Sequence, residues 1–383
     1  MHLAAAPHFI LADNGCVVFH LAGDHTRGTA GARVQVYGHA PAVALVGMVV
    51  GPEFLAMVGT FERFDEVIGG DAGFRRAGLL VLLGPADAEA VNANVEMHRQ
   101  VGIEAYALTL LELAELEPRL NLEGIGAIAW EPRSGYADPV LTASAFAEAA
   151  RRLGVDQRVG VTANTLVVGP SGVERVETTN GSIATRTVVV AAGYRTRELL
   201  APLGFDVPVR PIRHTIAVVQ RSSGFGRPHP TISDRVGGAY YRPEGQQLTL
   251  VGASSPFDGT EDPAVEVDRS PDPADESLLV SRFCHRFPSE ETAGLRRGYT
   301  GVYDCSPDLQ PILGPVPGIA GLHVAVGFSG HGFKLSPITG ELIAEKIVDG
   351  RTRLVNIDLF SPGRFAEDRL IASTHSYSVA THG

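Results

Sequence analysis

The stretch that decides the fold reads LHVAVGFSGHGFK over residues 322–334. Its first five residues are nearly all apolar, which is typical of a strand that is buried on both faces. A glycine-rich turn at 327–332 follows, and the spacing from about Pro337 to Asp349 predicts a helix. A buried strand, a glycine-rich turn and a helix in this order indicate one unit of an α/β sheet.

The turn is suited to binding a ligand. Its glycines let backbone N–H groups approach a ligand without interference from a Cβ atom. The helix that follows aims its N-terminus at the same place, which favours an anion or a carbonyl oxygen. Ser329, His331 and Lys334 are the polar members, and Lys334 would be a cation held on a rigid element. Similar turns also occur where the glycines serve packing alone, so that interpretation stays open.

Helical and strand patterns alternate on either side of this stretch, which favours the α/β class. Residues 86–100 and 109–117 read as amphipathic helices. Asp138 can cap a helix that begins at Pro139 and ends before Gly154. The apolar run at 187–192 predicts a buried strand that ends at Gly193, and further strands are expected over 211–255, with an exposed loop at 256–277.

Composition excludes several classes of function. The net charge is −11 and no cluster of Lys and Arg occurs, so a nucleic-acid partner is not expected. The three cysteines show no CxxC spacing, so we expect neither a disulfide scaffold nor a metal site. Neither a membrane span nor a secretory signal is evident, and a cytoplasmic location is expected.

The glycine-rich turn also has features of a hydrolase nucleophile site. The residues Gly-Phe-Ser-Gly-His at 327–331 resemble the nucleophile elbow G-x-S-x-G, but His331 replaces the last glycine. The elbow also needs a downstream histidine, and only His375 and His382 follow, in a tail that we expect to be disordered. The pattern therefore disfavours a hydrolase.

Two passages together closely resemble the C-terminal signature of the FAD-dependent D-amino-acid oxidase superfamily, with the sarcosine oxidase and glycine oxidase branch nearest. Residues 300–315 read TGVYDCSPDLQPILGP, and residues 321–335 read GLHVAVGFSGHGFKL. In that family both runs flank the flavin ring. The resemblance covers about residues 51–365 and includes the EPRSGYADP loop, VVVAAGY, VRPIRH and YYRPEG.

The resemblance implies an α/β fold with a discontinuous FAD-binding doubly wound (Rossmann-like) domain and a second α+β substrate domain with a mixed sheet. On this basis we expect the FAD-binding domain at 1–80, 140–210 and 300–365. The substrate-binding domain would comprise 81–139 and 211–299, and residues 366–383 would form a tail.

The implied function is an FAD-dependent oxidoreductase that oxidises the C–N bond of a small amine or amino acid, sarcosine-like or D-amino-acid-like, by hydride transfer to the flavin. The FAD is expected to be noncovalent, because Gly301 stands where some relatives carry the linking cysteine and Cys305 falls elsewhere. Oxygen-using relatives place a lysine in the strand that corresponds to 247–252, where Thr249 is the match. The electron acceptor, oxygen or an electron-transfer protein, stays open.

The resemblance also implies roles for individual residues. Lys334 and His331 are the candidate catalytic residues, and Lys334, Tyr240 and Arg242 are candidates for binding the substrate. His214 is a weaker candidate. The residues expected to contact the cofactor are Gly15, Ala192, Gly193, Gly314, Gly327, Ser329, Gly330, His331, Gly332, Phe333 and Lys334.

The N-terminus departs from the family pattern. The family begins with a strand, G-x-G-x-x-G and a helix that holds the FAD pyrophosphate. Here residues 8–22 read HFILADNGCVVFHLA, in which only Gly15 fits. Two phosphates without backbone N–H donors would lack compensation for their lost hydration. The alternative is therefore a degenerate flavoprotein fold that no longer binds FAD and acts as a non-catalytic binding module.

Overall fold

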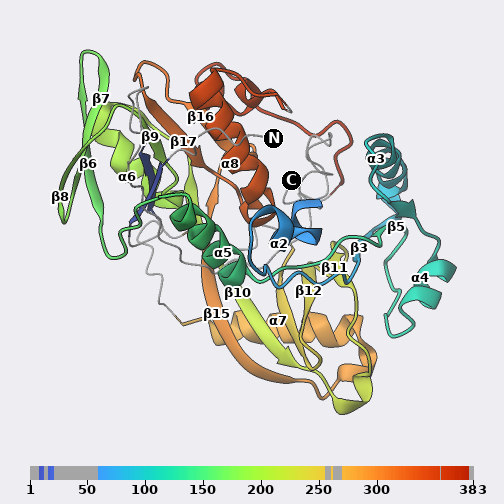
Figure 1. The fold of residues 1–383 in the computed structure, drawn as a ribbon. Helices are drawn as coiled ribbons and strands as arrows, with labels where there is room; N and C mark the ends of the chain where they lie inside the picture. Colours follow the sequence, from blue (N-terminus) through green and yellow to red (C-terminus); the bar gives the residue numbers. More distant parts are fainter. Residues whose placement is uncertain are drawn as a thin grey trace.

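The computed structural model describes residues 8–12, 16–20, 59–254, 260–261, 270–353 and 355–378. Over these residues the chain forms three β-sheets with helices packed against them (Figure 1). The mixed α/β class is the one that the sequence predicts. Gly15 lies outside the described residues, and so does most of the N-terminal segment that departs from the family pattern.

The first sheet contains the strand that decides the fold. Its order is β1-β2-β9-β17-β16, and β17 runs parallel to β9. Helix α8 (Gly332–Asp349) follows β17 and packs Leu335, Ile338 and Leu342 against it. The strands are β1 (His8–Ala12), β2 (Cys16–His20), β9 (Val188–Val190), β17 (Leu322–Val326) and β16 (Ile312–Pro315).

The second sheet is larger and mixed. Its order is β14-β10-β13-β12-β11-β3-β5-β4, with β15 also paired to β10. Only β11 and β3 pair in parallel; the other pairs between its described strands are antiparallel. The strands are β3 (Leu79–Leu83), β4 (Tyr106–Ala107), β5 (Ala127–Glu131), β10 (Arg210–Gln220), β11 (Thr231–Asp234), β12 (Ala239–Glu244), β13 (Leu248–Ala253), β14 (Thr260–Glu261) and β15 (Gly294–Cys305).

The two faces of the large sheet have different neighbours. Helix α7 (Pro273–Arg286) packs Leu279 and Phe283 against one face, which we call the helix face (Figure 1). Because side chains alternate along a strand, the neighbouring positions point to the other face. We call it the site face. It carries Thr231, Ser233, Tyr240, Arg242, Leu248, Leu250, Ile216, Val218, Tyr299 and Tyr303.

Helices α4 (Leu110–Leu116) and α5 (Pro139–Arg152) lie where the sequence predicts helices. Thr109 and Glu112 form a capping box at the start of α4. Asp138 accepts hydrogen bonds from the amides of residues 140 and 141 and caps α5. The other elements are α2 (Phe64–Val67), α3 (Ala88–Gln100), α6 (Thr196–Leu200) and a three-stranded sheet of β6 (Ala163–Gly169), β7 (Gly172–Thr178) and β8 (Gly181–Ala184).

Three expectations need correction. Helix α8 begins at Gly332 and not near Pro337, so Lys334 lies in the first helical turn; Pro337 costs one backbone hydrogen bond in the second turn, which flanking packing tolerates. Residues 273–277 were expected to lie in a loop, but they form the first turn of α7. The helix begins there because Asp272 caps it and Pro273 suits the first helical position. The tail at 371–378, part of what was expected to be disordered, contacts the rest of the chain through Ile371, His375, Tyr377 and Ser378.

Within the described residues, no helix is long and apolar enough to cross a membrane.

Candidate functional site

The glycine-rich turn is held in place by Asp304 at the end of β15. The Gly327 amide donates a hydrogen bond to Asp304 Oδ2 at 2.7 Å, and the Ser329 amide donates to the Asp304 backbone carbonyl at 3.2 Å. Burial raises the pKa of Asp304 to about 6, although hydrogen bonds from the backbone at 327, 304 and 328 lower it. Asp304 therefore holds the backbone of the turn in place at Gly327 and Ser329.

A second set of contacts fixes the middle of the turn. Ser329 has φ +51°, in the left-handed region that few residues other than glycine adopt. Its hydroxyl accepts a hydrogen bond from the Ser306 amide at 3.2 Å and donates to the Gly327 carbonyl at 3.1 Å. These bonds compensate the backbone strain at Ser329. Its hydroxyl is thus engaged within the turn.

The predicted cofactor glycines fall into two groups. A Cβ on Gly330 would come within 2.9 Å of the Tyr303 ring, and one on Gly332 within 2.7 Å of Phe328. Gly327 is likewise close to Ile312, at 3.0 Å. By contrast, a Cβ on Gly193 or Gly314 meets no described atom within 4 Å. Packing therefore explains the glycines of the turn, whereas it does not explain Gly193 and Gly314 among the described residues.

His331 lies at the N-cap of α8 and is 1% exposed. Neither of its ring nitrogens makes a hydrogen bond of normal geometry within the described part of the chain, although the Ser329 backbone interacts with the ring as a hydrogen-bonding group. Burial, and then the Lys334 cation, lower the pKa of His331 to about 3, while the nearby Ser329 backbone acts in the opposite direction. The ring is therefore neutral near pH 7, and it can donate one hydrogen bond and accept another.

Lys334 is half-buried in the first turn of α8. Burial and then the Arg235 guanidinium hold the pKa of Lys334 well below its usual range, while Glu131 raises it. Glu131 is itself engaged, because Ser134 Oγ donates to it at 2.6 Å and His98 lies 3.2 Å away. A negatively charged ligand would relieve the repulsion between the two cations.

The turn meets the site face at Tyr303, whose ring would contact a Cβ at Gly330. Tyr240 lies over Gly252, where a Cβ would be 2.5 Å from its ring. Burial, and then the Tyr303 and Tyr299 hydroxyls, raise the pKa of Tyr240 well above its usual range. Both phenols therefore stay protonated near neutral pH and form an aromatic wall facing the turn.

Arg242 is partly committed to other groups. Its Nη2 lies 2.5 Å from Glu244 Oε2, and its guanidinium lies 4.9 Å from the centroid of the Tyr136 ring. Its Nε atom has no hydrogen-bond partner among the described residues. The structure thus leaves one donor of this side chain for a ligand.

Several other buried polar atoms on the site face lack a hydrogen bond within the described residues. Buried polar groups are nearly always partnered, so a cluster of exceptions indicates a place that a ligand or water fills. The strand register places them next to one another, since Ser233 pairs with Tyr240. Together with His331 they comprise Thr231 Oγ1, Ser233 Oγ and Arg242 Nε, while the Tyr240 hydroxyl beside them interacts with the hydroxyl of Tyr303.

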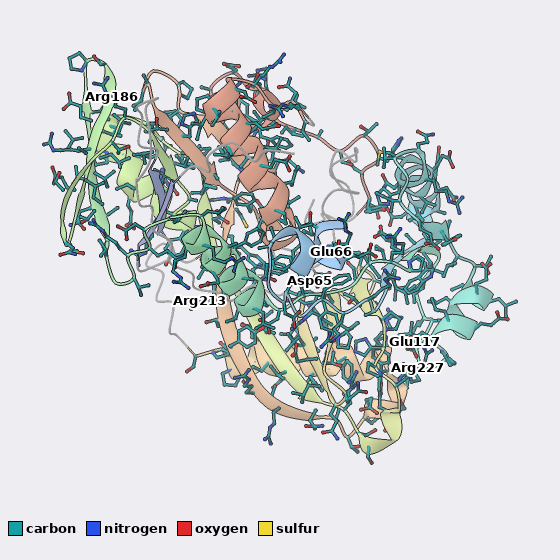
Figure 2. The ribbon with its side chains drawn as sticks, in the orientation of Figure 1. Asp65, Glu66, Glu117, Arg186, Arg213 and Arg227 are labelled. Carbon is teal, nitrogen blue, oxygen red and sulfur yellow. The ribbon has the colours of Figure 1, made fainter. Side chains whose placement is uncertain are left out.

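Ala192 and Gly193 reach the site from β9, and Phe333 from α8. Since β9 and β17 are parallel, their carboxyl ends lie at the same edge of the sheet, where ligands of open α/β sheets bind. Ala192 itself is buried, and its amide donates to the Thr196 hydroxyl. Phe333 packs on Phe61, 5.6 Å between ring centroids, beside helix α2, whose Asp65 and Glu66 are labelled in Figure 2.

Two expectations about strand residues are now tested by geometry. His214 is buried, with its ring 4.2 Å from that of Tyr303, so it backs the aromatic wall. Thr249 points to the helix face, where its hydroxyl bonds to His229 Nε2 at 2.8 Å. The match of Thr249 with a flavin-facing position is therefore wrong, because alternation in β13 gives that face to Leu248 and Leu250.

Sequence reasoning missed Asp304, Tyr303, Arg235 and Glu131. Tyr299 and Tyr303 were detectable, since they share one face of a long strand. Arg235 and Glu131 come from strands distant in sequence, so only the register brings them to Lys334. No group of three or more His, Cys, Asp or Glu that could hold a metal ion occurs among the described residues.

Comparison with known proteins identifies similar enzymes. Rat dimethylglycine dehydrogenase (Rattus norvegicus) is 26% identical over 84% of this chain, although the alignment covers only 39% of that longer protein. Glycine oxidase from Geobacillus kaustophilus is 29% identical over 75% of this chain and 73% of its own length.

Solved structures show the same relationship. L-proline dehydrogenase from P. horikoshii superposes with a TM-score of 0.74 at 26% identity, covering 84% of each chain. The glycine oxidase of G. kaustophilus gives a TM-score of 0.69 at 26% identity and covers 82% of this chain and 81% of its own. Several relatives are mitochondrial, so the cytoplasmic location stays a prediction.

A family model described as "DAO: FAD dependent oxidoreductase" matches residues 21–346. The chain therefore belongs to the DAO family of FAD-dependent oxidoreductases.

Proposed function

We propose that this chain oxidises the C–N bond of a small amino acid or carboxylate-bearing amine, with FAD as the acceptor of a hydride equivalent. The relatives named above include a glycine oxidase, an L-proline dehydrogenase and a dehydrogenase of dimethylglycine. All three names refer to small substrates that carry both an amine and a carboxylate.

The observation that carries the proposal is the environment of Lys334. Its ammonium is placed beside a second cation, Arg235, in a partly buried position where charge is costly. Among the charged groups that act on it, Arg235 disfavours the ammonium and Glu131 favours it. A substrate carboxylate would add a negative charge beside the two cations, and it would be bound by a charge-assisted hydrogen bond.

The other residues would orient the substrate. FAD, when bound, supplies the redox chemistry, while the protein provides position and charge. Tyr240 and Tyr303 would form a wall that excludes water on the site face, and His331 would hydrogen-bond the flavin ring in its neutral form. A protein base is dispensable if the amine binds unprotonated, so no further titratable group is required.

The test compares two substrates that differ only in charge. Lys334→Met removes the ammonium and keeps much of the volume of the side chain. We expect KM for a carboxylate-bearing amine to rise at least about tenfold, as a lost charged hydrogen bond of about 1.5–3 kcal/mol implies. KM for the corresponding neutral amine should change little. An equal effect on both substrates would remove the carboxylate-binding role.

A further inference from the structure

The C-terminal segment crosses from one sheet to the other. We call residues 371–378 the strap. At its beginning the Ile371 amide donates to Asp308 Oδ2 at 3.1 Å, in the loop that precedes β16. Near its end Ser378 donates twice to Asp87, from its amide at 2.6 Å and from its hydroxyl at 2.8 Å. The strap is therefore anchored at both ends.

The anchor at α3 is built for this contact. Asp87 occupies the N-cap position of α3, yet its carboxylate makes no capping bond to that helix. Asp87 is buried, and both of its oxygens accept from Ser378. About two turns farther along, Asn94 Nδ2 donates to the His375 carbonyl at 3.0 Å. The side chains of Asp87 and Asn94 thus form hydrogen bonds with the strap and not with the backbone of α3.

Between these anchors Tyr377 is inserted into the core. It is 9% exposed and packs against an apolar cluster formed by β3, β5 and α3. Burial raises the pKa of Tyr377 to about 12. Its hydroxyl is buried beside Asn94 without a hydrogen bond of normal geometry among the described residues. The members of the cluster are Leu79, Val81, Leu83, Val91, Val95, Ile103, Ala105, Ala127 and Ala129.

Tyr377 borders the site face, because it packs in one cluster with Leu79 and Val81, which pair with Thr231 and Ser233 of the site face. Glu131 and Arg235 are the charged groups that act on Lys334, and both also act on Tyr377. The strand register explains this, because Glu131 pairs with Leu79, which pairs in turn with Thr231. Tyr377 thus lies where the part of the sheet covered by α3 gives way to the site face.

We propose that the strap closes the substrate side of the site and that the Tyr377 ring limits the length of the carbon chain that can extend beyond a carboxylate bound at Lys334. This inference rests on the proposed function of Lys334. It makes Tyr377 a specificity-determining residue and assigns the enzyme to short-chain amino acids or amines. Removing the ring would leave an apolar space lined by Leu79 and Val81, which a longer chain can fill.

Binding of straight-chain carboxylates tests this directly. Acetate, propionate, butyrate, pentanoate and hexanoate are titrated into the FAD-loaded protein, and Kd is measured by calorimetry and by the change in flavin absorbance. In the parent protein the affinity should stop rising after the first members of the series. In Tyr377→Ala it should continue to rise, by up to about fourfold for each added methylene.

Three further variants serve as controls. Tyr377→Phe keeps the ring, so its affinity should depend on carboxylate chain length as in the parent protein; we call this dependence the parent profile. Tyr106→Ala removes a 40% exposed tyrosine on β4 and should also keep it. Asp87→Ala releases the end of the strap without touching its ring, and it should relax the profile as Tyr377→Ala does. If Tyr377→Ala does not fold, the affinities of Asp87→Ala for the carboxylate series decide whether the strap limits chain length.

The outcomes separate the two proposals. If the parent binds the short carboxylates, and Tyr377→Ala and Asp87→Ala show the parent profile, the role of the strap is overturned while that of Lys334 stands. If the parent binds no carboxylate, the role proposed for Lys334 fails, and the strap loses its function as a wall of the substrate site with it.

Discussion

Arg364 and Asp308 form a bidentate ion pair beneath the glycine-rich turn, with Nε–Oδ2 and Nη2–Oδ1 distances of 2.8 Å each. Arg364, in the 3-10 helix η8 (Pro362–Phe365), is fully buried. The same carboxylate accepts from Ser306 Oγ at 3.2 Å, and Ser306 in turn holds Ser329. The ion pair thus connects the C-terminal part of the chain to the turn that carries His331.

Loss of one partner of this pair should be costly. Arg364→Met leaves the Asp308 carboxylate buried without its cation, and we expect a loss of about 3–5 kcal/mol in the free energy of unfolding. Urea denaturation measures it. The double variant Arg364→Met, Asp308→Leu should recover part of the loss, because it removes the uncompensated charge as well. A double variant as unstable as the single one would show that packing of the arginine, and not its charge, matters.

Asp304 should make stability depend on pH in a distinctive way. Its pKa is raised from 3.8 to about 6 in the folded chain, so the folded state holds a proton that the unfolded state has lost. Stability therefore falls as pH rises from about 4 to above 6. The shift corresponds to at most about 3 kcal/mol, and to about 1–2 kcal/mol at this partly exposed side chain.

The variant Asp304→Asn keeps an oxygen for the Gly327 amide but cannot ionise. Relative to the parent protein, it should gain stability between pH 4 and pH 7. The comparison with the parent is necessary because His331, whose pKa is lowered to about 3, shifts stability in the opposite direction over this range. A difference in unfolding free energy that stays constant with pH would contradict the raised pKa of Asp304.

Two glycine variants distinguish packing from ligand space. In Gly330→Ala the new Cβ would approach the Tyr303 ring at 2.9 Å, so both stability and FAD content should fall. In Gly193→Ala the Cβ meets no described atom, and only the backbone cost of φ +53°, about 1–2 kcal/mol, is expected. FAD content should nevertheless fall, because Gly193 is expected to contact the cofactor. A Gly193→Ala protein that retains a full complement of FAD would refute this.

Carboxylate binding should weaken as pH rises. The pKa of Lys334 lies well below its usual range because of burial and Arg235, and a bound carboxylate would raise it again. Binding therefore takes up a proton at pH values above the lowered pKa, and Kd for acetate should increase with pH. Calorimetry in buffers of different ionisation enthalpy counts the protons. In Lys334→Met the pH dependence should disappear along with most of the affinity.

The sequence predicts the fold well where local signals are strong. The apolar run Leu322–Val326, the cap at Asp138 and the helical pattern at 109–117 all lead to the elements observed. The start of α8 was misjudged because Pro337 looks like a first helical residue. Packing of Leu335 and Phe333 extends the helix backwards past it, and a sequence pattern does not show that contribution.

The site was only partly predictable for a similar reason. Turn residues adjacent in sequence, from Gly327 to Lys334, are found together because they are local. The residues named for the site face come instead from five strands whose order depends on register, so Arg235 and Glu131 could not be assigned beforehand. The strap was missed because its polar sequence resembles a disordered tail, and only Tyr377 marks it as packed.

The most direct test of the central claim is anaerobic mixing of the FAD-loaded protein with short amino acids and N-methyl amino acids, followed by flavin absorbance. At least one short carboxylate-bearing amine should bleach the flavin, and Lys334→Met should slow the bleaching at low substrate concentration. A flavin that stays oxidised with every member of the panel, in a protein that carries stoichiometric FAD, would contradict the central claim.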